Sequence, residues 1–212
     1  RLILGLLIKS PKKIKIIGDK SLSKRDFSRV TVPLEKFGVK FSYKIKNKLP
    51  LTILGTQSSK GIKYLENRGS AQCKSSIMLA ALNASETTSI KAKKSRDHTE
   101  LLFKYLKIPI KVRKTKKFDF IDIKKPKKIN AFNYQIPGDI SSSAFFMVLT
   151  TLAYNSKLLI KSVNINPSRV GVITILKKMG AQIILKNKKN YRGEKISDIS
   201  IKSSKKLKAI NC

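Results

Sequence analysis

The chain has 212 residues and carries 47 Lys and Arg against 12 Asp and Glu, a formal charge of +35. Hydrophobic residues make up 41%, so a buried core in one or two domains is possible. An excess of positive charge this large is typical of proteins that bind nucleic acid or another polyanion. The lysines are scattered along the whole chain beside many Ile and Asn residues, which favours a coding bias toward AT-rich codons over a polyanion-binding face.

The composition also argues against several kinds of site. The two cysteines, Cys73 and Cys212, lie far apart and imply no disulfide, and the only histidine, His98, has no Cys or His neighbour for a zinc site. Cys73 stands among apolar residues of an expected helix and is interpreted as a small buried residue. The first apolar run, at residues 2–8, is too short to cross a bilayer and lacks the pattern of a signal peptide. We interpret it as part of a helix within a longer chain.

Three segments of the chain, residues 1–43, 70–112 and 140–185, share one order of expected elements. Each starts with an apolar or small-residue helix, followed by a β-rich run, a polar loop with an arginine, a second helix and a further strand. Apolar residues spaced three and four apart predict the second helices. In the first and third segments these residues are Val32, Leu34, Phe37, Val170, Ile173, Ile175, Leu176 and Met179. Pro167 precedes the last of these helices, where its missing N–H is harmless.

The ends of the second helices are marked by Gly38, Lys107 and Gly180, which lie about 70 residues apart. Glycine at such an end suits a left-handed helix cap. The repeat predicts an α/β protein of similar βαβ-type units packed around a shared core, with the helices facing inward and the sheets covering them. The Pro-Gly break in residues 135–139, "QIPGD", is predicted as the domain boundary between the second and third units.

The stretch "GSAQCKSS", residues 69–76, is the first candidate for a binding site. Ser70 stands where a helix N-cap belongs, directly before an apolar helix. The first N–H groups of a helix are unpaired and lie at the positive end of its dipole, so a phosphate docks there readily. Gln72 could add an amide and Lys74 a charge. Taken alone, these residues favour the plainer interpretation of a capped helix.

Three further helix starts are weaker candidates. Ser95 and Arg96, in "KKSRDHTE", combine an N-cap with a bidentate phosphate donor, although a solvated helix turn explains them equally well. Lys24, Arg25 and Arg29 crowd one turn near a helix start, where cations are unfavourable unless an anion compensates. The start at "IPGDISSSAFF" is interpreted as a capped helix at the domain junction. The sequence shows no catalytic triad, paired carboxylates, metal cluster or P-loop.

Six stretches together resemble the 5-enolpyruvylshikimate-3-phosphate synthase family in sequence and in order. They are "GDKSLSKRDFSRVTVPLEKFG", "LPLTILG", "SAQCKSSIMLAALNASETTSI", "SRDHTELL", "IPGDISSSAFFMVLTTLA" and "NPSRVGVITILKKMGAQI". The resemblance implies a two-domain fold of βαβαββ-type units with the active site between the domains. It also implies transfer of the enolpyruvyl group of phosphoenolpyruvate to the 5-hydroxyl of shikimate 3-phosphate, releasing phosphate, in the shikimate pathway. No metal or organic cofactor is implied.

The resemblance also implies roles for particular residues. It places Ser70, Ala71 and Gln72 around shikimate 3-phosphate, with Gln72 also near phosphoenolpyruvate, and Ala71 can contribute only its backbone. Ser95 matches a serine that contacts the substrate phosphate, and Arg25 matches an arginine that binds phosphoenolpyruvate. Arg29 is a weaker match. No family role carries over to four other residues, which are Lys74, Arg96, Asp139 and Arg169.

Several family motifs are expected outside this chain. The early Lys-Ser…Arg motif and the Asn-Ala-Gly-Thr loop would precede Arg1. The catalytic Asp, a Lys-Glu-x-x-Arg motif and a final basic residue would follow Cys212. The chain is therefore expected to be an internal fragment, with residues 1–137 forming most of one domain and residues 138–212 the beginning of the other. We expect no catalytic acid or base within it.

We further expect a cytoplasmic protein, monomeric when complete, that binds small-molecule substrates and neither a membrane nor a specific nucleic acid. Two alternatives stay open. The UDP-N-acetylglucosamine enolpyruvyl transferase of cell-wall synthesis shares the fold and the phosphoenolpyruvate chemistry, although "SAQ" and "SRDHTE" favour the shikimate enzyme. A basic nucleic-acid-binding protein would need a localised patch with aromatic residues for stacking, whereas the 9 Phe and 6 Tyr lie mostly in apolar or helical contexts.

Overall fold

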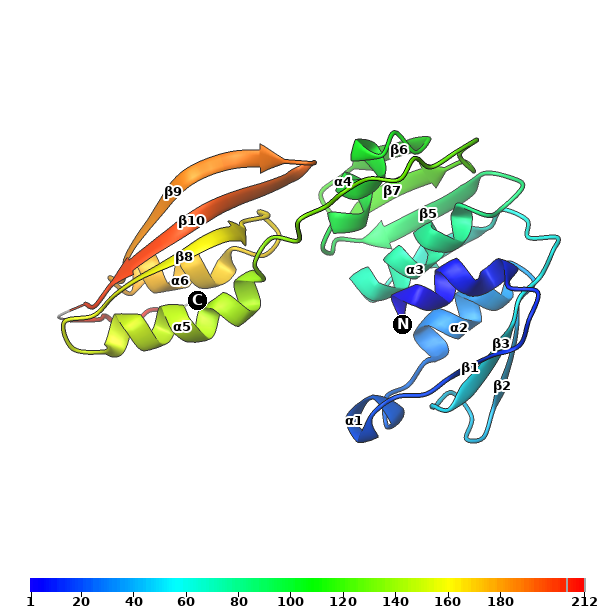
Figure 1. Cartoon of the computed structure of the whole chain (residues 1–212), viewed down its shortest axis with the longest axis horizontal. Helices are drawn as coiled ribbons and strands as arrows, with labels where there is room; N and C mark the ends of the chain where they lie inside the picture. Colours follow the sequence, from blue (N-terminus) through cyan, green and yellow to red (C-terminus); the bar gives the residue numbers. More distant parts are fainter. Residues whose placement is uncertain (205, 212) are drawn as a thin grey trace. The chain divides into compact units, whose positions relative to one another are not determined.

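The computed structural model describes residues 1–204 and 206–211 and divides into two compact units, Arg1–Asn130 and Ala131–Cys212. Each unit contains both helices and β-sheets (Figure 1). The elements of the first unit are η1 (Leu2–Lys9), β1 (Ile14–Ile16), α1 (Lys20–Ser23), α2 (Ser28–Glu35), β2 (Lys40–Tyr43), β3 (Leu51–Leu54), β4 (Lys63–Glu66), α3 (Ala71–Ala81), β5 (Thr88–Lys93), α4 (His98–Tyr105), β6 (Ile110–Lys114) and β7 (Phe118–Ile123). Those of the second unit are α5 (Ile140–Leu152), β8 (Lys157–Asn164), α6 (Gly171–Lys178), β9 (Gln182–Tyr191) and β10 (Glu194–Lys202).

The middle repeat is a complete βαβαββ unit. Its elements β4, α3, β5, α4, β6 and β7 follow one another and form a sheet in the order β4-β5-β7-β6, with β4 parallel to β5 and β7 antiparallel to both neighbours. The first and third repeats form the sheets β1-β3-β2 and β8-β10-β9, which match the last three strands of this pattern. In the third repeat Gly138 makes a parallel bridge to Val163 of β8, where β4 pairs with β5 in the middle repeat. The predicted repeat is confirmed.

The ends of the second helices also correspond. Gly38, Lys107 and Gly180 have positive φ angles of 94°, 55° and 99° and follow α2, α4 and α6, which are each eight residues long. After Lys107 and after Gly180, the next N–H reaches back to a helix carbonyl at 2.9 Å, as in a Schellman cap. In the middle repeat, Lys107 therefore adopts the left-handed conformation that glycine adopts in the other two repeats.

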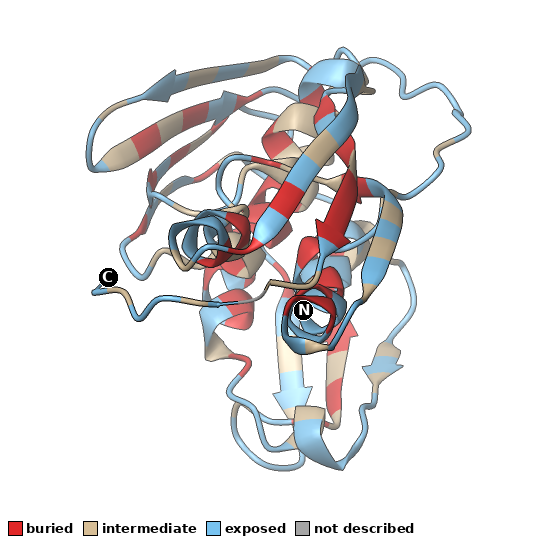
Figure 2. Ribbon diagram, turned by 90° about the vertical axis from the view of Figure 1, so that its left-hand side faces the viewer, coloured by how far each residue is buried: buried red, intermediate tan, exposed pale blue. Residues whose placement is uncertain are grey.

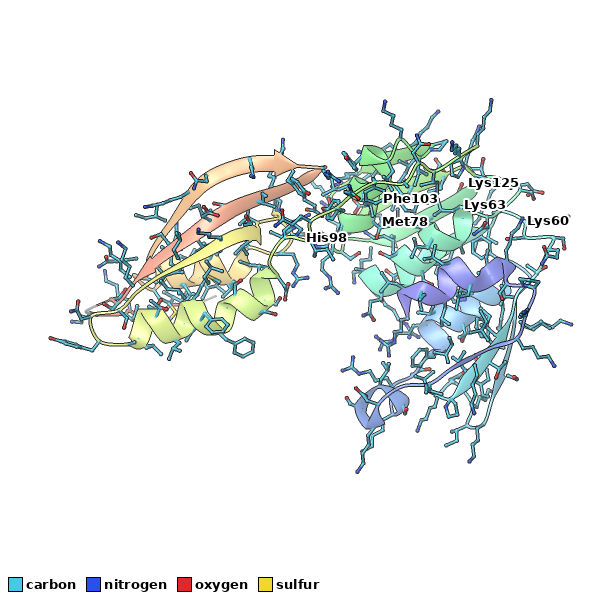
Figure 3. All side chains as sticks on the ribbon, in the orientation of Figure 1. Lys60, Lys63, Met78, His98, Phe103 and Lys125 are labelled. Carbon is cyan, nitrogen blue, oxygen red and sulfur yellow. The ribbon has the colours of Figure 1, made fainter. Side chains whose placement is uncertain are left out.

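Helices η1, α2 and α3 pack on one another and contact strands of both sheets in the first unit. Their buried side chains share one core with strand residues such as Ile53 and Ile90. Figure 2 shows buried residues, in red, on helices and strands, whereas the connecting loops are mostly exposed, in pale blue. Met78 of α3 and Phe103 of α4, labelled in Figure 3, belong to the same core and are 0% and 2% exposed. The expectation of inward-facing helices holds for this unit.

The apolar spacing identified α2 and α6 as helices, but not every residue in that spacing is buried. Val32 is 49% exposed and Ile175 is 41% exposed. The buried apolar residues of α2 include Val30 and Leu34, which lie four positions apart on one face of the helix. Val32 stands midway between them in sequence and points to the opposite face, because two residues turn an α-helix by about 200°.

The structure divides the units at residues 130 and 131, before the Pro-Gly break at which the sequence predicted the boundary, between residues 137 and 138. The stretch between the two positions packs on the second unit. The Tyr134 ring lies 5.5 Å from the Tyr191 ring, and the Tyr191 hydroxyl accepts a hydrogen bond from the N–H of Gln135 at 3.1 Å. Because these contacts precede the Pro-Gly break, the break lies inside the second unit.

Helix α5 has apolar residues on two faces. Ile140 and Met147 are buried in the core that the second unit forms with strands β8 and β10. On the other face, Phe145, Leu149 and Leu152 are 78%, 65% and 68% exposed. The expectation of inward-facing helices therefore holds for only one side of α5.

Within the described ranges, the structure contains no helix that combines the length and the apolar character needed to cross a membrane.

Candidate active site

Arg1 lies where the starts of three helices meet in the first unit. Its Nη1 donates to the side-chain oxygen of Gln72, in the first turn of α3, at 3.2 Å. Its Nη2 donates to the carbonyl of Asp26, shortly before α2, at 2.9 Å, and its guanidinium carbon lies 5.3 Å from the centre of the Phe27 ring. Arg1 itself precedes η1. These contacts bring the N-terminal ends of η1, α2 and α3 together.

The start of α4 joins the same region through α3. The hydroxyls of Ser75 in α3 and Thr99 in α4 are hydrogen-bonded at 2.7 Å. A methyl group placed on Gly69, before the N-cap of α3, would lie 3.4 Å from the carbonyl oxygen of Lys94, so the loops that lead into α3 and α4 are in contact. The positive dipole ends of these helices therefore gather in one part of the first unit, which suits an anion.

The first turn of α3 offers hydrogen-bond donors. The Ser70 hydroxyl oxygen accepts a bond from the N–H of Cys73 at 3.3 Å, which leaves its own proton to donate to a ligand. The N–H groups of Ala71 and Gln72 start the helix and have no carbonyl within it to bond. Gly69 precedes them with a φ of +68°, a conformation that glycine adopts without strain. This turn presents one hydroxyl and two backbone N–H groups.

The bond from Arg1 fixes the orientation of the Gln72 side chain. Arginine only donates hydrogen bonds, so the atom that Gln72 turns toward Arg1 must be its carbonyl oxygen. The amide nitrogen, with its two N–H donors, then points away from Arg1. The Gln72 side chain is therefore oriented to donate hydrogen bonds from its amide nitrogen, which is what an anionic ligand requires.

The hydroxyl of Ser95 is buried and has no hydrogen-bond partner among the residues that the structure describes. Leaving such a group unsatisfied costs about 1–3 kcal/mol. Its neighbour Lys94 touches the loop before α3, so the loop of Ser95 lies beside that of Ser70. A phosphate at the start of α3 would give the Ser95 hydroxyl an acceptor.

Arg25 and Arg29 add positive charge close to Arg1. Burial lowers the pKa of the Arg1 guanidinium, and the charges of Arg25 and Arg29 lower that pKa further. Both neighbours are exposed, and the backbone N–H of Arg25 bonds the carbonyl of Leu22 at the end of α1 at 3.1 Å. Because the guanidinium groups repel one another, a bound anion would stabilise their arrangement.

A pocket of about 190 Å³ opens beside the N-cap of α3. Ser70, Arg29 and Arg68 line it together with the buried carboxyl group of Glu66. One Glu66 oxygen accepts a bond from the N–H of Arg68 at 3.1 Å. The pocket thus places two arginines beside the serine for which the sequence predicted an anion contact.

Lys74, which the sequence suggested as a possible phosphate ligand, is turned into the core. It is fully buried and forms an ion pair with Glu100 of α4 at 2.5 Å. Burial raises the pKa of Glu100, and the nearby charge of Lys74 acts in the opposite direction. Lys74 is therefore engaged within the protein and does not face a ligand.

Two other residues without a predicted role, Asp139 and Arg169, lie in the second unit. Asp139 caps α5 by accepting a bond from the N–H of Ser142 at 3.0 Å. Arg169 donates to Asp139 at 3.2 Å and also to the hydroxyl of Ser141. Both residues hold the start of α5, as the interpretation of a capped helix expected.

Arg96, the remaining residue without a predicted role, lies in the first unit and is exposed.

Arg1 is the residue at this site that the sequence analysis missed. It contacts Gln72 across 71 positions of the chain, and it stands directly before an apolar run without any recurring pattern. Only the folded packing of η1 on α3 reveals the contact.

Comparison with known proteins identifies the family. A sequence profile described as EPSP synthase (3-phosphoshikimate 1-carboxyvinyltransferase) matches residues 1–212. The chain belongs to the EPSP synthase family. The predicted resemblance to this family is confirmed.

Curated members of the EPSP synthase family match nearly the whole chain. The 3-phosphoshikimate 1-carboxyvinyltransferase of Thermoanaerobacter sp. (strain X514) is 41% identical over 211 residues, which are 99% of this chain and 48% of that protein. The enzyme of the same name from Bacillus subtilis (strain 168) is 37% identical over 212 residues, 99% of this chain and 48% of that protein. The chain therefore spans about half the length of the curated relatives it matches.

Solved structures support the same fold. The EPSP synthase from Acinetobacter baumannii is 38% identical, with a TM-score of 0.81 over 99% of this chain and 46% of that chain. The enolpyruvyl transferase NikO from Streptomyces tendae has a TM-score of 0.68 at 13% identity, over 97% of this chain and 47% of that chain, and shows the fold alone. The predicted α/β enolpyruvyl transferase architecture is confirmed.

Cys73 is buried, as the sequence predicted, and its thiol is free, whereas Cys212 lies outside the described residues. Burial raises the pKa of the Cys73 thiol to about 11, and the Glu66 carboxylate raises it as well. At pH 8 roughly one such thiol in a thousand is ionised. We therefore expect iodoacetamide to modify Cys73 very slowly at pH 8, with a rate that rises about tenfold per pH unit between pH 7 and 9.

Mass spectrometry of a Cys212→Ser variant measures this rate for Cys73 alone. The same variant unfolded in urea is the control, because an exposed thiol with an ordinary pKa reacts much faster. Equal rates in the folded and unfolded protein would show that Cys73 is not shielded.

Proposed function

We propose that the complete protein containing this chain transfers the enolpyruvyl group of phosphoenolpyruvate to the 5-hydroxyl of shikimate 3-phosphate, in aromatic amino acid biosynthesis. The observation that carries the proposal is the meeting of the helix starts that contain or adjoin Ser70, Gln72 and Ser95, beside a group of arginines. The relatives named 3-phosphoshikimate 1-carboxyvinyltransferase supply the reaction.

The proposed reaction is an addition followed by an elimination. The oxygen of the 5-hydroxyl bonds to C2 of phosphoenolpyruvate while a proton adds to C3 and a base accepts the hydroxyl proton. Loss of phosphate from C2 and of a proton from C3 then restores the double bond. Because both substrates are multiply charged anions, the protein must offset their repulsion and hold them in contact.

Within this chain we assign binding roles only. Ser70, Ser95 and the N–H of Ala71 would hold the phosphate of shikimate 3-phosphate. Gln72 would donate its amide hydrogens between the two substrates, and Arg25 would bind phosphoenolpyruvate. The catalytic acid and base would come from parts of the protein beyond this chain, and no metal or organic cofactor takes part in the proposal.

The organisation of the complete protein is part of the same proposal. The first unit would form most of one domain and the second unit the beginning of the other. The complete protein would be a monomer that works in the cytoplasm.

The test measures phosphate release by the complete protein with both substrates present. We expect release that depends on both substrates, and none from the 212-residue chain alone. Replacing shikimate 3-phosphate with UDP-N-acetylglucosamine should abolish release. Turnover with UDP-N-acetylglucosamine instead would assign the protein to the cell-wall enzyme, and no turnover with either acceptor would refute the proposal.

A basic surface bears on the nucleic-acid alternative. On the four-stranded sheet of the first unit, a hollow of about 680 Å³ is lined by residues that include Lys91, Lys111, Arg113 and Phe120. The Arg113 guanidinium lies 4.1 Å from the centre of the Phe120 ring, and the Lys91 ammonium lies 4.8 Å from that of Phe118. These cations lie over the aromatic rings on which a nucleobase would need to stack. We therefore propose no specific nucleic-acid partner. Sequence-selective binding at physiological salt would contradict this.

A further inference from the structure

Lys74 and Glu100 form an ion pair inside the first unit, closed off from solvent. Lys74 Nζ and Glu100 Oε1 are 2.5 Å apart, and the side chains are 0% and 4% exposed. The other oxygen of Glu100 has no hydrogen-bond partner in the described ranges. Taking two charges out of water costs free energy, and an apolar pair of similar volume is often as stable or more stable. Stability alone therefore does not explain this pair.

The pair lies one turn from the groups that face the candidate ligand. Lys74 is two positions after Gln72 in α3, and Glu100 lies in the first turn of α4. The next residue of α3, Ser75, is bonded to the residue before Glu100, Thr99, at 2.7 Å. Two neighbouring residues of one helix thus hold two neighbouring residues of the other, which fixes both the spacing and the rotation of the two helix starts.

We propose that Lys74 and Glu100 are positioning residues, which set the distance between the first turn of α3 and the loop of Ser95 and so the fit of the substrate phosphate. An ion pair holds two particular atoms together, whereas apolar side chains can slide past each other at little cost. Neither residue touches the ligand. The identity of that ligand, shikimate 3-phosphate, rests on the proposed function, but the geometry applies to any phosphate bound between Ser70 and Ser95.

The test compares three variants of the complete enzyme. Lys74→Met leaves Glu100 buried without its counter-charge, and we expect the thermal midpoint to fall by roughly 10 °C. Lys74→Met combined with Glu100→Leu removes both charges and keeps an apolar contact, so its midpoint should return to within a few degrees of the wild type. Lys114→Met is the matched control, because Lys114 is 54% exposed and pairs at 2.7 Å with Asp97, also at the start of α4.

For the double variant we expect the KM for shikimate 3-phosphate to rise about tenfold while kcat changes less than about threefold. The dissociation constant of inorganic phosphate, measured by calorimetry, should rise by the same factor. Lys114→Met should change neither constant. A double variant with both the stability and the binding constants of the wild type would show that the pair is structural only, and would overturn the proposal.

The two proposals fail in different ways. If the wild-type enzyme releases no phosphate from its two substrates, the proposed function is wrong, and the phosphate affinities of the wild type and the double variant still decide the positioning role. If the wild type binds no phosphate and releases none from its two substrates, both proposals are wrong. Lys74→Met alone decides neither, because its loss of stability would weaken binding for either reason; the double variant is therefore the decisive one.

Discussion

Replacing Arg25 with alanine in the complete enzyme should lower kcat/KM for phosphoenolpyruvate by about 100-fold. Arg25 lies two residues after the end of α1, exposed and close enough to Arg1 to lower the pKa of that guanidinium. A guanidinium that bonds an anionic substrate through two N–H groups contributes about 1.5–3 kcal/mol per bond, so losing both costs at least two orders of magnitude. Steady-state kinetics with phosphoenolpyruvate as the varied substrate measure the loss.

The matched control is Lys24→Ala, which removes the neighbouring positive charge from the same turn. We expect less than a threefold change, because a change in general electrostatic attraction at an exposed position is screened by salt. Equal losses for the two variants would mean that Arg25 contributes only its charge to the surroundings and makes no direct contact with phosphoenolpyruvate.

Replacing Gly5 with alanine should lower the free energy of unfolding by about 3 kcal/mol, or the thermal midpoint by roughly 10 °C. A Cβ atom at Gly5 would stand 2.1 Å from the backbone oxygen of Ser76 and 3.1 Å from Cβ of Leu79, so η1 and α3 must separate to admit it. That shift would also pull Arg1 away from Gln72. Thermal unfolding followed by circular dichroism measures the change, and failure to obtain soluble protein would be the same effect in a stronger form.

The control for Gly5 is the same substitution at Gly171, the first residue of α6. A Cβ atom there meets nothing within 4 Å. We expect Gly171→Ala to raise the free energy of unfolding by up to about 1 kcal/mol, because alanine loses less backbone entropy than glycine on folding. A Gly5→Ala variant as stable as Gly171→Ala would show that η1 and α3 are not packed backbone to backbone.

The order of elements could be predicted from the sequence because it depends on local patterns repeated three times. The spacing even identified Lys107 as the counterpart of Gly38 and Gly180, and all three residues have a positive φ. The buried face of each helix was harder to predict. In α2 the exposed Val32 is as apolar as the buried Val30, and composition alone does not tell which of them meets the core.

The candidate site was predicted unevenly, because local sequence patterns determine only some of its residues. Ser70 follows from local capping rules, and its predicted capping bond is present. The roles of Gln72 and Ser95 depended on the family resemblance and stay predictions. Lys74 was ambiguous because a sequence shows that a residue is charged but not that it is buried opposite Glu100. Arg1 depends on a contact across the fold that no local pattern encodes.

The exposed apolar face of α5 has a consequence for colloidal behaviour. The exposed side chains of Phe145, Leu149 and Leu152 form an apolar surface that favours self-association. The net charge of +35 opposes it, because the molecules repel one another. The repulsion reaches about 30 Å at 0.01 M salt and only about 3 Å at 1 M, whereas apolar attraction does not weaken with salt and kosmotropic anions strengthen it. The isolated 212-residue chain should therefore stay dispersed in dilute buffer and cluster as ionic strength rises.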